Sequence, residues 1–330
     1  MPVRKAETRF PANLAAADLG ESAGAPDGKC TLVSFLTSPL PPGQKNTYVA
    51  FVTDPALAGS VQSYEWSIAE DGAFPLTVET DVGEMSYQPE NIGTIVVTVR
   101  LFDGGANEVA SVTLVQEIGP LNPALETLIA NAADQPGAGI SNPEVMREVV
   151  NGYISYYGSV ALKTPEPGDA FKRCVCSFLC DGVLKRTPDE RQALSSKLAA
   201  VLDDNADEFP TVAAEGVGVC GIRLGLLAMV LPTSNPLLAW TELPEDANQN
   251  AVADEQLRGQ LAGLSDADKI DLINIARFPK TNIALCAGII EALRDKYFPG
   301  VSFADVLTEL SGTRQHWIGM HFAKGPIAKS

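Results

Sequence analysis

The sequence predicts a protein of two parts that mixes α and β structure: an N-terminal β-sandwich followed by an all-α helical domain. Residues 30–116 alternate apolar and polar side chains in short segments with turns between them, which is typical of strands. After Gly119-Pro120 the apolar residues recur at helical spacing, behind capping signals. We therefore expect a flexible lead over 1–27, the sandwich over 28–118 and the helical domain over 119–330.

The strand pattern is clearest in two segments of the front part. Tyr64, Trp66 and Ile68 share one face of their strand, and the row from Ile95 to Leu101 ends at the turn Asp103-Gly104-Gly105. About seven short strands at this spacing favour a sandwich. A Trp on a central strand is expected to fill the core rather than to bind a ligand.

Several motifs of this part resemble a known family. They are Tyr64-Glu65-Trp66, Ser86-Tyr87-Gln88-Pro89, Gly93-Thr94-Ile95-Val96-Val97-Thr98-Val99 and Asp103-Gly104. Together they resemble a PKD-type Ig-like domain, although Ile95 stands where that family often has Tyr. The resemblance covers about a quarter of the chain. It implies a spacer or an adhesive surface, and it implies no catalytic residues.

Helix signals mark the rest of the chain. Ser265 has the character of an N-cap, and Leu285, Ile289 and Leu293 recur every four residues, which predicts an amphipathic or buried helix. The apolar run from Gly216 to Leu231 contains Arg223 and is shorter than the ~20 residues of a membrane span. We therefore interpret this run as a buried helix at the centre of the helical domain.

The charge of the chain limits its partners. The formal net charge of −17 disfavours nucleic acid, because a phosphate backbone would be repelled, and it disfavours anionic membranes for the same reason. The first residues, from Met1 to Glu7, lack the apolar segment of a secretory signal. We expect synthesis in the cytoplasm, with any release or injection by a route that needs no signal peptide.

Six cysteines are present, and only Cys30 lies in the sandwich part, so that part cannot hold an internal disulfide. The densest group is Cys174, Cys176 and Cys180. Cys176 and Cys180 would share a helix face while Cys174 would not, and the Cys-x-x-Cys spacing of zinc sites does not occur. We expect buried thiols without a cofactor, and a metal site at these three residues is the weaker alternative.

No motif in the sequence names a reaction. The chain has two histidines, His316 and His321, and no nucleophile elbow or phosphate loop surrounds them or any other residue. If the helical domain were catalytic, the scarce ionisable groups beside apolar segments would be the candidates: His316, His321, Arg314 and Arg223. The alternative interpretation is structural: these groups would serve packing and ion pairing.

Three functions remain open on the sequence alone. The leading hypothesis is a non-enzymatic interaction or structural protein that binds protein partners. Bacterial phage-tail-like contractile injection particles assemble Ig-like modules without secretion, so this chain could be a component or a cargo of such a particle. The second hypothesis is an enzyme or toxin effector that uses the Ig-like part for targeting. An extracellular adhesin or carbohydrate-binding protein ranks third, because most aromatic residues of the sandwich alternate inward.

Overall fold

The structure is a computed structural model that describes residues 10–11, 14–43, 45–120, 216–218, 220–223, 263–297 and 300–302. The chain divides into two compact units. The first unit comprises residues 1–160 together with Phe278–Lys280, and the second comprises 161–277 and 281–330. Antiparallel sheets in the N-terminal part and helices nearer the C-terminus confirm the predicted order of β and α structure.

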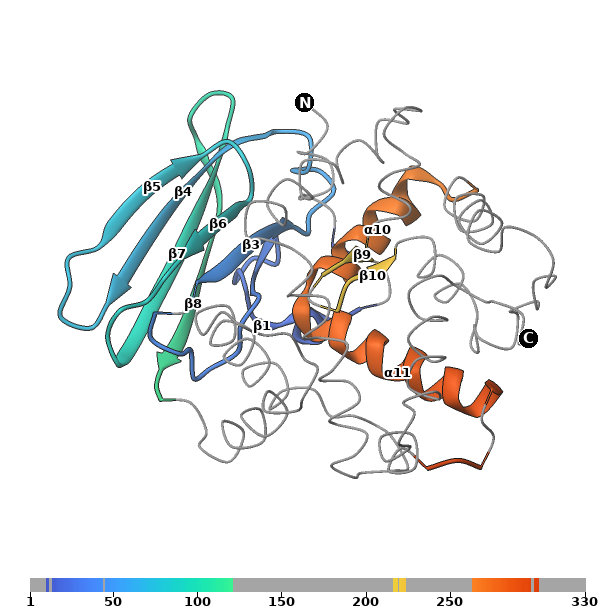
Figure 1. Ribbon diagram of the computed structural model, residues 1–330. Coiled ribbons are helices and arrows are strands. Elements are labelled where there is room, and N and C mark those ends of the chain that lie inside the picture. The colour runs from blue at the N-terminus through green and yellow to red at the C-terminus, as the bar shows by residue number, and fades with distance from the viewer. Residues whose placement is uncertain are drawn as a thin grey trace. The chain divides into compact units, whose positions relative to one another are not determined.

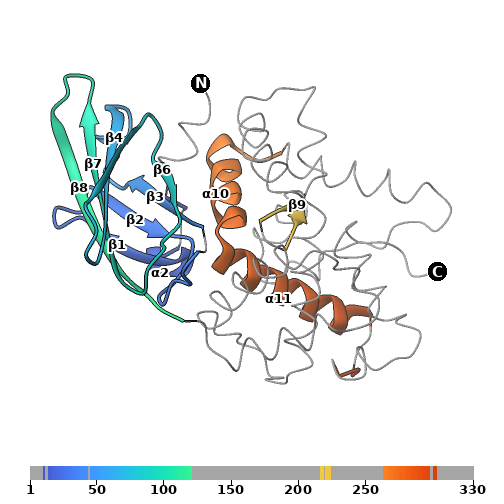
Figure 2. The ribbon, with the colours of Figure 1, turned by 60° about the vertical axis from the view of Figure 1, so that its left-hand side comes forward.

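The first unit contains two antiparallel sheets of four strands each (Figures 1 and 2). One sheet has the order β1-β2-β3-β6 and the other β5-β4-β7-β8. The strands are β1 (Glu21–Gly24), β2 (Cys30–Ser34), β3 (Asn46–Val52), β4 (Val61–Glu70), β5 (Leu76–Thr80), β6 (Glu84–Tyr87), β7 (Gly93–Asp103) and β8 (Glu108–Ile118). The two sheets contact each other where β8 meets β1 and β2.

Alternation along β4, β7 and β8 builds the core between the sheets. The inward row of β7 runs from Ile95 to Leu101 in steps of two and is fully buried, as the period-two pattern predicts. Trp66 on β4 is also fully buried, and its indole Nε1 donates a 2.8 Å hydrogen bond to Thr80 Oγ1 on β5. The expectation that Trp66 fills the core is therefore confirmed.

The central strands β2 and β3 of the sheet β1-β2-β3-β6 are buried on both faces, which explains the continuous apolar run of β3. The second face of the sheet carries Val33, Val49 and Phe51. These three residues form one buried hydrophobic cluster with Leu19, which precedes β1, and with Phe278, which lies far along the chain. The ring of Phe278 lies 4.7 Å from that of Phe35 and 5.8 Å from that of Phe51, centroid to centroid. The first unit therefore completes its core with a residue that is distant in sequence.

The segment before β2 differs from the expected flexible lead. It contains the short helix α2 (Ala16–Leu19) and the edge strand β1, which pairs with β2 from Glu21↔Ser34 to Gly24↔Thr31. The sequence of β1, Glu-Ser-Ala-Gly, has no apolar alternation, so no local pattern marks it as a strand. Its place in the sheet is set by the exposed edge of β2 and by the burial of Leu19.

A buried polar network joins the two sheets at β1 and β8. Gln116 Nε2 donates hydrogen bonds to Glu21 Oε2 at 2.8 Å and to the Leu36 carbonyl at 3.0 Å. Asn46 Nδ2 donates to Ser34 Oγ at 2.8 Å, while Asn46 Oδ1 accepts from the Leu36 amide at 3.0 Å. Because buried polar groups are costly when unpaired, this set of bonds fixes how β1 lies against β8.

The described part of Gly216–Leu231 corrects the predicted buried helix. Residues 216–218 and 220–223 belong to a β-hairpin of β9 (Gly216–Val217) and β10 (Ile222–Arg223). Gly218 and Gly221 close its turn with φ angles of 72° and 63°, a conformation that glycine adopts without strain. The glycine spacing was the turn signal, and it outweighs the apolar composition that suggested a helix.

Two helices of the second unit follow the expected signals. Helix α10 (Asp266–Arg277) begins after Ser265, whose Oγ accepts a hydrogen bond from the Asp268 amide at 3.2 Å and so caps the first turn. Helix α11 (Pro279–Tyr297) starts at a proline, the residue type favoured at the first helical position. The helix start predicted at Ser265 and the helix predicted around Leu285, Ile289 and Leu293 are confirmed.

Asn282 on α11 ties the hairpin of the second unit to the helices. Its side chain is fully buried, and Oδ1 accepts from the Cys220 amide at 2.8 Å. Its Nδ2 donates to the carbonyls of Val217 at 3.0 Å and Ala276 at 2.8 Å. One amide side chain therefore satisfies three backbone groups, which is a structural role.

Candidate functional site

The described residues of the sandwich present a long edge strand, β8, beside an open groove. β8 is an edge of its sheet because the order β5-β4-β7-β8 places β7 on one side and no strand on the other. Its even-numbered residues from Ala110 to Ile118 are buried, and Thr113, Val115 and Glu117 between them are exposed. The strand therefore turns one face to the core and keeps one edge and one face outward.

The direction of the backbone groups along β8 follows from three contacts. The Glu117 carbonyl accepts a hydrogen bond of 2.7 Å from the Leu40 amide, away from β7. The hydroxyls of Thr98 and Thr113 are 2.8 Å apart, as expected where facing residues exchange no backbone bonds and their side chains lie closer. The register of β7 and β8 is continuous from Gly93↔Ile118 to Leu101↔Ala110. The odd-numbered residues of β8 therefore point their N–H and C=O groups away from β7.

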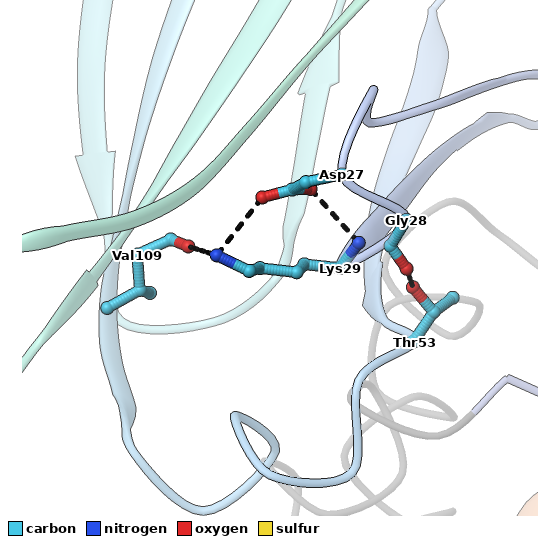
Figure 3. A network of polar contacts seen from close by, with 5 residues as sticks. All are labelled: Asp27, Gly28, Lys29, Thr53 and Val109. Carbon is cyan, nitrogen blue, oxygen red and sulfur yellow. Dashed lines mark hydrogen bonds and ion pairs between the residues drawn. The ribbon is translucent and has the colours of Figure 1, made fainter.

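Both ends of this edge are occupied. At the C-terminal end, Leu40 forms a parallel bridge with Ile118. At the N-terminal end, the ammonium of Lys29 donates to the Val109 carbonyl at 3.5 Å and lies 3.2 Å from Asp27 Oδ2. Figure 3 shows the Lys29 side chain extended between Asp27 and Val109. A lysine on an edge carbonyl is a common device against unwanted strand pairing.

The middle of the edge consists of Ser111, Thr113 and Val115. Among the residues that the structure describes, none forms a hydrogen bond with the outward N–H or C=O of these three. Val115 is 56% exposed, which is unusual for a large apolar side chain. The central edge therefore offers main-chain donors and acceptors to a further strand.

An open groove of about 650 Å³ adjoins this edge. One wall is formed by Gly24, Pro26 and Asp27 at the turn between β1 and β2, and the other by residues 108–113 of β8. The buried network through Gln116 and the contact of Lys29 with Val109 hold the two walls together. Sequence reasoning placed no site here.

The charged residues that line the groove are acidic, and the Lys29 ammonium lies beside the groove on Asp27. Asp27 and Glu108 line it, and the backbone N–H of Lys29 lowers the pKa of the Asp27 carboxyl, so Asp27 is ionised at neutral pH. The Thr53 hydroxyl donates to the Gly28 carbonyl at 2.7 Å and braces the turn that carries Asp27 (Figure 3). The arrangement suits a positively charged side chain on an incoming segment.

The catalytic candidates named from the sequence are not brought together in the described structure. His316, His321 and Arg314 lie outside the described residues, as do Cys174, Cys176 and Cys180. Arg223 ends strand β10 in the small hairpin. The described cysteines are Cys30, Cys220 and Cys286, and each is buried and outside any disulfide. Burial raises the pKa of the Cys30 thiol to about 11, which makes this sulfur inert at neutral pH.

The described residues form neither a metal site nor a membrane span. No group of three or more His, Cys, Asp or Glu side chains is placed to hold a metal ion in this part of the chain. None of the described helices is both long enough and apolar enough to cross a membrane.

A second exposed feature lies at one end of the sandwich. Phe74 is 99% exposed, Ile92 67% and Leu76 48%. The turns that carry Phe74 and Ile92 lie side by side, because the Asp71 amide donates to the Thr94 carbonyl at 3.0 Å. Nothing in the described part of the chain shows what covers this apolar end.

Comparisons with known proteins give little. No protein-family profile matches the chain, and no curated protein matches it. Among solved structures, a β-1,2-glucanase from Parabacteroides distasonis aligns with 88% of this chain at 10% sequence identity and a TM-score of 0.23. The alignment spans 42% of that glucanase chain. A TM-score this low carries no inference about fold or activity.

Proposed function

We propose that this protein is a non-enzymatic interaction or structural protein whose N-terminal sandwich is a PKD-type Ig-like docking module. The observation that carries the proposal is the central edge of β8, where Ser111, Thr113 and Val115 present outward main-chain groups beside an open groove. Exposed strand edges bind extended segments of other proteins by main-chain hydrogen bonds. Natural proteins usually shield such edges, and in this sandwich the shielding by Lys29 and Leu40 stops at the two ends.

The proposal includes the setting inferred from the sequence. The protein is made in the cytoplasm and is a component or a cargo of a phage-tail-like contractile injection particle. Two features support an Ig-like module: the pair of four-stranded antiparallel sheets and the buried Trp66 on a central strand. The charge of −17 supports protein partners over nucleic acid.

The test is a tagged pull-down from the native host, with mass spectrometry of the recovered proteins and sizing of the complex. We expect recovery in a large particle with tube, sheath or baseplate-like proteins. Recovery as a small species alone would contradict the proposal and would favour the effector hypothesis. His316→Ala would then be tested for loss of toxicity with the fold retained.

A further inference from the structure

We propose that the central edge of β8 binds a short, extended, positively charged segment of a partner protein by strand addition. This inference rests on the proposed interaction function and names the surface and the chemistry of the partner. The edge from Ser111 to Val115 spans roughly five residues, or about 17 Å of strand. Since Lys29 and Leu40 occupy the flanking positions, a longer strand would have to displace them.

The chain already shows both kinds of contact that this binding would use. Leu40 pairs with β8 through two backbone hydrogen bonds, from its amide to the Glu117 carbonyl and from the Gly119 amide to its own carbonyl. Lys29 shows that an ammonium group is accepted between the Val109 carbonyl and the Asp27 carboxylate. The partner would extend the pairing of Leu40 along the strand and place a further cation in the acidic groove.

The charge around the central edge of β8 favours one kind of binding partner. A second copy of this chain would bring another net charge of −17 and another Glu108 and Glu117 to the edge, which is unfavourable at low ionic strength. A segment with lysine or arginine side chains beside the paired backbone would instead meet Asp27 and Glu108. We therefore assign the edge to a cationic partner rather than to self-association.

The direct test uses the full chain and two synthetic peptides. The first is an acetylated peptide of about eight residues in which lysine and valine alternate, a pattern suited to strand addition. The second carries glutamate in place of every lysine. We expect the lysine peptide to bind at least about tenfold more tightly than the glutamate peptide at low salt, with the preference reduced by added salt. We also expect it to slow hydrogen exchange at the amides of Ser111, Thr113 and Val115.

Two matched variants of the edge separate main-chain pairing from other effects. Thr113→Pro removes an outward N–H that β7 does not use, and proline is tolerated on the open side of edge strands. We expect it to weaken binding about tenfold. Thr113→Val keeps the N–H and removes only the hydroxyl, so binding should be retained. Circular dichroism and the urea midpoint establish that each variant is folded.

A third variant keeps the inference testable if Thr113→Pro does not fold. Lys29→Ala frees the Val109 carbonyl and leaves Asp27 without its ammonium partner, so the lysine peptide should bind more tightly. Arg100→Ala is the control for charge, because it removes a cation that lies opposite Ser111 but pairs with Glu65 rather than with Asp27 and the Val109 carbonyl. Equal binding of both peptides, or binding that neither Thr113→Pro nor Lys29→Ala changes, would overturn the inference.

The remaining outcomes separate this inference from the proposed function. A dimer that forms with rising concentration and is lost in Thr113→Pro would make a second copy the occupant and overturn the cationic partner. If the native-host pull-down recovers the particle equally well with Thr113→Pro, the proposed function stands and the β8 inference fails. If wild-type protein is recovered alone while the lysine peptide still protects the edge, the particle role fails and the edge assignment stands.

Discussion

Tyr87 and Glu70 join the two sheets of the sandwich. The Tyr87 hydroxyl on β6 donates a 2.8 Å hydrogen bond to Glu70 Oε1 on β4, and these strands belong to different sheets. The other Glu70 oxygen accepts from the Asn91 amide at 3.2 Å, while Oε1 also accepts from the Glu90 amide at 3.2 Å. Glu70 is only 7% exposed, so one buried carboxylate holds the loop between β6 and β7.

Removing the Glu70 carboxylate is expected to destabilise the sandwich. Glu70→Ala leaves the amides of Glu90 and Asn91 and the Tyr87 hydroxyl without their acceptor, which costs about 2 kcal/mol in the free energy of unfolding. Glu90→Ala is the matched control, because its exposed side chain is lost while its amide stays bonded, and it should change stability by less than about 0.5 kcal/mol. Urea unfolding followed by fluorescence measures both; equal effects would contradict this role of Glu70.

The same pair predicts a loss of stability in alkali. Burial, followed by the hydrogen bond to Glu70, raises the pKa of Tyr87 to about 12. In the unfolded chain the pKa is about 10, so the unfolded state ionises first as pH rises. The contribution of Tyr87 to the free energy of unfolding is therefore fully present below pH ~10 and is lost as pH rises toward 12. The stability difference between wild type and Tyr87→Phe should shrink over this range. A constant difference would show that Tyr87 ionises alike in both states.

Phe278 is expected to be as important to the first unit as any residue of the strands. It is fully buried against Phe35 and Phe51, so Phe278→Ala should lower stability by about 3–5 kcal/mol. Phe74→Ala makes the same substitution at a side chain that is 99% exposed, and it should stay within about 0.5 kcal/mol of wild type. Hydrogen exchange of the β2 and β3 amides reports on this unit. Unchanged exchange in Phe278→Ala would refute the packing role.

Two glycines of the second unit should respond to alanine in opposite ways. Gly218 has φ of 72°, and a Cβ there would collide with the Ala276 carbonyl and the Asn282 amide group, so Gly218→Ala should cost about 2 kcal/mol or more. Gly288 lies within α11 and has open space where a Cβ would be, so Gly288→Ala should stabilise by about 1 kcal/mol. Thermal unfolding of both variants gives the signs, and a shared sign would contradict the geometry.

Local pattern explains which elements the sequence could predict. Alternation at Tyr64, Trp66 and Ile68 identifies a strand because neighbouring residues of a strand face opposite sides. The cap at Ser265 identifies a helix start for an equally local reason. The strand β1 has no such pattern, and the burial of Phe278 depends on residues far away in the chain. Neither could be predicted from a window of sequence.

The candidate site escaped sequence reasoning for a different reason. Its binding groups are the main-chain N–H and C=O of Ser111, Thr113 and Val115, and every residue carries such groups. No motif marks them, since their availability depends on sheet order. The one usable signal was Lys29, a lone cation in an acidic neighbourhood next to Asp27.

The placement of Phe278 has a consequence for biosynthesis. The strands of the sandwich leave the ribosome roughly 160 residues before Phe278, which corresponds to a delay of about 10–30 s at ordinary elongation rates. During that interval the face formed by Val33, Val49 and Phe51 lacks one of its buried partners. The N-terminal residues that cover this face, Phe10, Leu14 and Leu19, are made before the strands, so the core of the first unit lacks only its late member until the segment of Phe278 emerges.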